Sequence, residues 1–96
     1  MYKGKISIYD RILAVVVEEF GISKQVLFRS NECDCVQARM ALVVGLAGRG
    51  LSDKDIAELT GMRRCSVCAI RNRYKEASAA WSVRRCVEII NELRGA

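Results

Sequence analysis

The stretch TGMRRCSVCAIRNRY, residues 60–74, gathers side chains with evident chemical uses. It holds four arginines, two cysteines three positions apart and a serine at position 66. Arginine donates paired hydrogen bonds to phosphate and to the guanine edge, whereas paired cysteine thiolates bind metals such as zinc. The stretch therefore fits three interpretations: a helix that reads DNA, half of a metal site, or a basic surface helix.

Positive charge is concentrated around this stretch. The 96-residue chain has a net charge of +5, and residues 61–85 contain seven Lys or Arg and one Glu. One segment thus carries the whole basic excess, which points to a polyanionic partner for that segment. The alternative is a face whose charges only improve solubility.

The cysteines form two close pairs, Cys33-x-Cys35 and Cys65-x-x-Cys68. Together they have the pairing of a four-thiolate zinc site. However, the first pair alternates along the chain and the second falls inside an expected helix. We therefore predict reduced thiols, with no metal and no cofactor, and we place Cys86 in the core.

An enzyme is not expected. The chain lacks histidine, the commonest general base, and "AGRGLSDK" lacks the pattern of a phosphate-binding loop. The acids at 53, 55 and 58 follow the start of a helix, where negative charge favours the helix dipole. No catalytic residue is predicted.

Helical periodicity dominates the elements that must position these residues. Proline is absent, and apolar side chains recur every three or four positions. Capping boxes are expected at Ser7–Asp10 and Ser52–Asp55, and Ser23 is expected to cap the short second helix. Glycines at 21, 48, 50 and 61 mark helix ends. The prediction is a single all-α domain over 1–96 with about six helices, near 7–20, 23–28, 34–47, 52–59, 64–76 and 79–94.

Apolar stripes indicate which helix faces are buried. In the helix near 64–76, Val67, Ile70 and Tyr74 form the inward stripe, leaving Cys65, Cys68, Ala69 and Asn72 outermost. Trp81 is predicted to lie in the core rather than to stack on a base. No apolar run approaches the ~18 residues of a membrane span, and no signal peptide is evident, so we expect a cytoplasmic protein without membrane contact.

Residues 52–75 have the order of a helix-turn-helix unit: a short helix, a tight turn with Gly61 and a second helix. In such units the second helix enters the major groove and its first residues meet base edges. The basic excess falls on that second helix and beyond it.

Three further segments carry a resemblance that covers Ile12–Tyr74. They are "AVVVEEFGISKQVLF", "QARMAL" and "GLSDKDIAELTGM". With them the chain resembles the C-terminal DNA-binding domain of the bacterial replication initiator DnaA, which has a Trp repressor-like helix-turn-helix. The resemblance implies an all-α fold and binding to double-stranded DNA. Where that family has its base-reading Asp, His and Thr, this chain has Arg63, Arg64 and Cys65, and the family's basic loop is acidic here at Glu32 and Asp34.

We therefore predict double-stranded DNA binding through the helix at about 64–76. The predicted contacts are Arg63, Arg64, Cys65, Ser66, Arg71, Arg73 and Lys75, with Arg84 and Arg85 extending the phosphate footprint. The alternative is a protein-interaction module on a DnaA-like scaffold that no longer reads DNA. The acidic 31–34 loop and the small-residue face of the helix favour that alternative.

Overall fold

A computed structural model describes residues 2–30, 32–76 and 81–92, and within them the chain is all-α. The helices are α1 (Tyr2–Phe20), α2 (Lys24–Arg29), α3 (Cys33–Gly48), α4 (Asp53–Thr60), α5 (Arg64–Glu76) and α6 (Trp81–Glu92). The predicted fold class and helix order are confirmed. None of the described helices has both the length and the apolar character of a membrane span.

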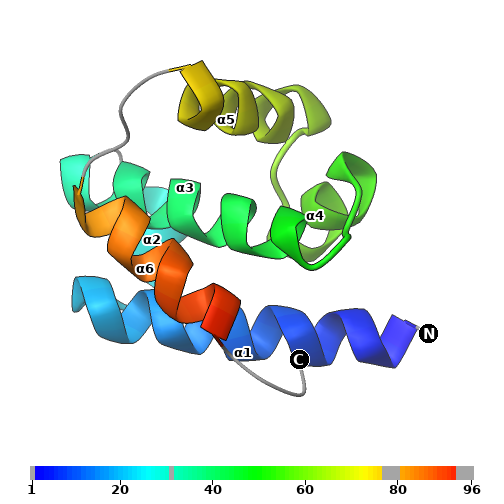
Figure 1. Cartoon of the computed structure of the whole chain (residues 1–96), viewed down its shortest axis with the longest axis horizontal. Helices are drawn as coiled ribbons and strands as arrows, with labels where there is room; N and C mark the ends of the chain where they lie inside the picture. The colour runs from blue at the N-terminus through cyan, green and yellow to red at the C-terminus, as the bar shows by residue number, and fades with distance from the viewer. Residues whose placement is uncertain (1, 31, 77–80, 93–96) are drawn as a thin grey trace.

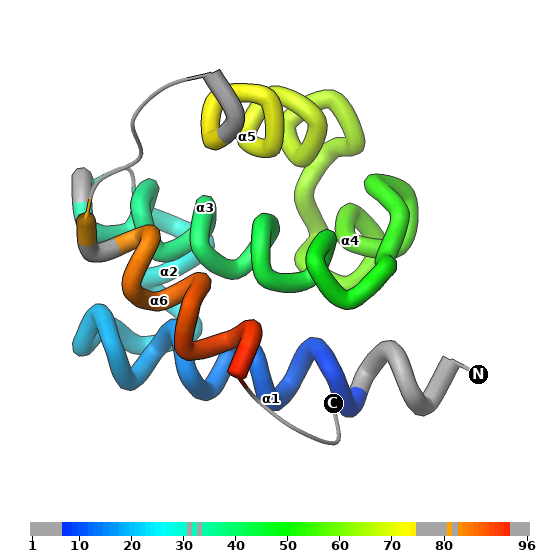
Figure 2. The backbone as a smooth tube through the Cα atoms, viewed as in Figure 1, coloured from blue at the N-terminus to red at the C-terminus, as the bar shows by residue number. Residues whose placement is uncertain are grey.

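Helix α3 lies at the centre and packs against α1, α2, α4, α5 and α6. Figure 1 shows α1 and α5 on opposite sides of α3, with α6 crossing α3 and α1. The smooth trace in Figure 2 shows that α5 runs back along α3 in the opposite direction. Helix α5 is thus held from one side, by α3 and α4.

Aliphatic side chains from these helices form one core. Ile12 and Val16 of α1, Leu42 and Leu46 of α3, and Ile90 of α6 are each fully buried. Helix α3 is buried around most of its circumference. Its buried small residues let the neighbouring helices approach closely; these are Ala38, Ala41 and Gly45. A Cβ atom on Gly45 would lie 2.9 Å from two Ile90 methyl groups, so the α3–α6 crossing depends on this glycine.

Side-chain caps fix several helix starts. The hydroxyl of Ser23 accepts a hydrogen bond from the Val26 N–H at 3.3 Å, and that of Ser52 accepts one from the Asp55 N–H at 3.2 Å. Both caps confirm the sequence pattern. The expected capping box at Ser7–Asp10 is wrong, because α1 already begins at Tyr2 and both residues lie within it.

Arg39 lies within α3 and Arg49 directly follows it. Each side chain donates a hydrogen bond to a backbone carbonyl of another segment. The Arg39 guanidinium donates to the Ser30 carbonyl at 2.8 Å, where α2 ends. The Arg49 guanidinium donates to the Ile90 carbonyl at 2.6 Å, in the last turn of α6. Carbonyls at a helix end lack intrahelical donors, so a cation there is favourable. The sequence analysis gave neither arginine this role.

Candidate nucleic-acid interface

The α4–α5 turn is fixed by a short chain of polar contacts. Gly61 adopts a left-handed conformation with φ +77°, and its N–H donates to the Ala57 carbonyl at 2.9 Å. The Thr60 hydroxyl donates to the Ile56 carbonyl at 2.7 Å and accepts from the Met62 N–H at 3.2 Å. These bonds determine where the chain leaves α4 and where α5 starts.

Helix α5 presents its predicted faces. Val67 is fully buried, and Ile70 and Tyr74 pack partly buried against the core. Cys65, Cys68, Ala69 and Asn72 are exposed. The helical wheel therefore assigned the inward and outward sides of α5 correctly.

Arg63 and Arg64 are both exposed at the start of α5. Within the described part of the chain, neither forms an ion pair with a carboxylate. The Arg63 carbonyl accepts from the Val67 N–H at 3.1 Å, which anchors the backbone of Arg63 to the first turn. A fixed backbone thus carries two solvent-exposed guanidinium groups.

Arg71 differs from the prediction. Its guanidinium pairs with the Asp53 carboxylate, and both side chains are partly buried between α5 and α4. The pair links α5 to α4, which the sequence could not show because the two residues are 18 positions apart. Arg71 thus has a partner within the protein, and the function proposed below does not depend on it.

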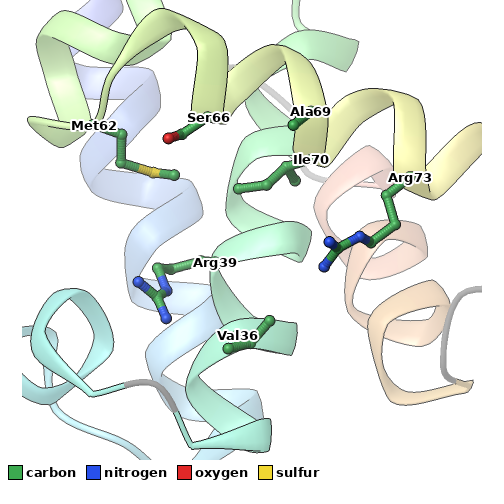
Figure 3. A pocket seen from close by; sticks show the side chains of 7 residues that line it. All are labelled: Val36, Arg39, Met62, Ser66, Ala69, Ile70 and Arg73. Atoms are coloured by element: carbon green, nitrogen blue, oxygen red, sulfur yellow. The ribbon is translucent and has the colours of Figure 1, made fainter.

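Ser66 and Arg73 lie along the flank of α5 that faces α3. They line a hollow of about 300 Å³ between the two helices, together with Val36, Arg39, Met62, Ala69 and Ile70. Figure 3 shows Arg39 on α3 and Arg73 on α5 at its two sides, with Ile70 between them. Arg39 was not among the predicted site residues, although it is the sole cation in residues 30–48.

The remaining predicted cations fall toward the end of α5 and on α6. Lys75 is in the last turn of α5, and its side chain lies outside the described residues. Arg84 and Arg85 are exposed on α6, and the Arg85 guanidinium carbon lies 5.6 Å from the centre of the Trp81 ring. In Figure 1, α6 begins on the side where α5 ends, away from the start of α5.

Trp81 is 74% exposed, so its predicted place in the core is wrong. The inward stripe of α6 consists of Val83, Cys86, Val87 and Ile90. Trp81 precedes Val83 by two positions, or roughly 200° around a helix, and therefore projects from the opposite face. The ring is partly covered by the Arg85 guanidinium in a cation–π contact.

Among the described side chains, Cys35, Cys65 and Cys68 do not come together as a four-thiolate zinc site requires. Cys35 and Cys86 are 1% exposed, whereas Cys65 and Cys68 are exposed. The described residues contain no group of three or more potential metal ligands, and the Cys33 side chain lies outside them. Cys86 lies in the core, as predicted, and burial raises the pKa of its thiol to about 11.

Comparisons of the chain with protein families, with curated proteins and with solved structures give no match.

Proposed function

We propose that this protein binds double-stranded DNA, with the start of α5 entering the major groove. The observation that carries the proposal is the pair of exposed arginines, Arg63 and Arg64, held by a fixed turn at the start of a helix. Arginine at this position of a helix-turn-helix unit can donate to guanine O6 and N7 or to phosphates.

The flank of α5 supplies a second part of the interface. Ser66 and Arg73 lie along it, and Arg39 of α3 lies across the hollow. Groups on the flank of a groove-bound helix are placed to meet the phosphate backbone, which gives affinity without sequence preference. Cys65 and Lys75 belong to the same helix as Ser66 and Arg73, and they remain among the proposed DNA contacts.

The salt dependence of binding tests the proposal. If Arg63, Arg64 and Arg73 each neutralise one phosphate, raising salt from about 50 to 200 mM lowers affinity for a mixed-sequence duplex roughly 40-fold. Fluorescence anisotropy of a labelled duplex measures both the affinity and the slope. Undetectable or salt-independent binding would overturn the proposal.

A charge-matched pair of variants locates the interface. Arg63→Ala with Arg64→Ala should reduce the slope of log affinity against log salt by about 2. Lys24→Ala with Arg29→Ala also removes two exposed positive charges, but from α2, which packs on α1 and α3. This control should leave the slope nearly unchanged. Equal losses from both pairs would mean that binding follows net charge and not α5.

A protein partner for α5 is the second candidate, favoured by Glu32 and Asp34. Both side chains are exposed where α3 begins, and carboxylates there repel phosphate. In this case Glu32→Arg with Asp34→Arg raises DNA affinity greatly. Under the DNA proposal the same double variant raises affinity only as much as a net charge change of +4 away from the interface would, and Arg63→Ala with Arg64→Ala strongly weakens binding.

A further inference from the structure

The thiols of Cys65 and Cys68 on α5 are exposed, unlike those of the other described cysteines. Cys35 and Cys86 fill space in the core, and each is 1% exposed. Cys65 and Cys68 are exposed and contribute nothing to that core. Free cysteine is among the most often buried residue types, so two on the solvent face of one helix require a different explanation from packing.

The spacing of Cys65 and Cys68 suits chelation. Residues three apart on a helix lie on the same face, with Cβ atoms about 5–6 Å apart. Rotation about the two Cα–Cβ bonds can therefore bring both sulfur atoms to one ion above the helix surface. The Asn72 side-chain amide, one turn further on, donates to the Cys68 sulfur at 3.7 Å and helps to hold that thiol in place.

The number of ligands selects the kind of metal. Structural zinc takes four ligands in a tetrahedron, and no cluster of three or more potential ligands occurs among the described side chains. Soft thiolate ligands favour Cu(I), zinc and iron–sulfur clusters, and of these Cu(I) is the one that is stable with only two sulfur ligands in a near-linear arrangement. A two-thiolate complex of a monovalent ion carries one negative charge, which the exposed Arg63 and Arg64 nearby would offset.

We propose that Cys65 and Cys68 form a two-coordinate site for one monovalent soft metal ion of the Cu(I) class per chain. Binding forms two S–Cu bonds and releases the proton of each thiol, with no change in the oxidation state of sulfur or metal. The site requires no DNA and does not depend on the proposed function of α5.

A competition titration tests the site on the full chain. Cu(I) is supplied anaerobically as its complex with bicinchoninate, and the loss of the complex's colour reports transfer to the protein. We expect one Cu(I) per chain, at a monomer mass by native mass spectrometry. Cys65→Ser and Cys68→Ser should each weaken binding at least 100-fold. Because both side chains are exposed, the helical circular dichroism should not change.

Two further variants keep two thiols on the outer face, change their spacing and share the replacement of Asn72, which removes its bond to Cys68. Cys68→Ser with Asn72→Cys leaves thiols at 65 and 72, about 10.5 Å apart along the axis, and should bind as weakly as the single variants. Cys65→Ser with Asn72→Cys leaves them at 68 and 72, one turn apart, and should restore one-to-one binding.

Three outcomes would overturn the proposal. The first is unchanged affinity in the Cys65→Ser/Cys68→Ser double variant, which would locate the metal elsewhere. The second is one ion per two chains at a dimer mass, which would mean that the thiols bridge copies and do not chelate. The third is equal binding by the two spacing variants. DNA affinity does not enter any of these measurements, so failure of this site and failure of DNA binding are distinguishable.

Discussion

Two regions of the molecule are held together by different interactions. One is the crossing of α1, α3 and α6, and the other is the contact between α4 and α5. In the first region, fully buried aliphatic side chains meet around a glycine, Gly45. In the second, a few apolar contacts are supplemented by directional polar bonds from Thr60, Gly61 and the Arg71–Asp53 pair. Packing volume therefore controls the scaffold, whereas hydrogen bonds control how the exposed arginines are presented. The two regions should respond to different substitutions.

The largest effect is expected at Gly45. Gly45→Val places a branched side chain where even a Cβ atom lies 2.9 Å from two Ile90 methyl groups and 3.4 Å from Ile12. One of these methyls is attached directly to the Ile90 Cβ, so side-chain rotation alone gives little relief. We expect the free energy of unfolding to fall by about 3 kcal/mol, measured by urea denaturation.

Gly48→Ala is the matched control on the same helix. A Cβ atom there meets only the Asn91 side-chain oxygen at 3.4 Å, and the residue is exposed. Because alanine favours helix over glycine, stability should stay the same or rise by up to about 1 kcal/mol. A loss at Gly48 as large as that at Gly45 would contradict the role given to the α3–α6 crossing.

The second effect concerns the titration of the buried Cys86 thiol in the core. Burial, with a smaller contribution from Glu19, raises the pKa of Cys86 from its ordinary value of 9.0 to about 11. The folded state thus holds this proton more tightly, so stability is fully present below pH 9 and falls as pH rises to 11. The loss should be roughly 2 kcal/mol, since each pH unit of raised pKa corresponds to about 1.4 kcal/mol.

Cys86→Ala checks the source of that loss. The variant is less stable at pH 8 because it removes buried volume, but its further decline between pH 9 and 11 should be smaller than that of the native chain. Burial also raises the pKa of Tyr9, with Asp10 contributing, so part of the alkaline decline persists in the variant. Identical declines in both chains would exclude Cys86 as the titrating group.

The sequence predicted what depends on local spacing. The helix order, the caps at Ser23 and Ser52, and the inward stripe of α5 all follow from periodicity and capping chemistry, and the structure confirms them. The predicted start of α1 was wrong. A capping pattern at Ser7 marks a helix start only if the residues before it are not helical, and here the helix already begins at Tyr2. Local patterns thus predict elements better than their ends.

Features that depend on two distant segments could not be predicted. Gly45 matters because Ile90 packs on it, and Arg71 is paired because Asp53 lies opposite it on α4. Trp81 was misplaced because aromatic side chains lie in a core more often than they stack on bases, while its angular position on α6 puts it outside the stripe of Val83 and Ile90. The DNA contacts and the resemblance to the DnaA domain stay predictions.

The third effect tests the turn that positions the arginines. Gly61→Ala forces a left-handed conformation on a residue with a side chain, although no atom lies within 4 Å of the added Cβ. The cost should be about 1–2 kcal/mol of stability, with weaker DNA binding as α5 shifts. Gly50→Ala is the control, because Gly50 is also left-handed with open space around it but lies between α3 and α4. It should cost similar stability and leave DNA affinity unchanged.

The smallest effect concerns the Arg71–Asp53 pair, whose side chains are 34% and 27% exposed. Solvent screening limits such a pair, so a double-mutant cycle of Arg71→Met and Asp53→Asn should give a coupling energy of about 0.5 kcal/mol. The informative readout is the salt dependence of DNA binding.

If Arg71 serves only to join α5 to α4, Arg71→Met leaves the slope of log affinity against log salt unchanged, whereas Arg63→Ala reduces that slope by about 0.9. Equal reductions would return Arg71 to the phosphate contacts. The α4–α5 unit would then be held chiefly by Thr60, Gly61 and its apolar contacts, and the polar bonds would matter less than the comparison with the core suggests.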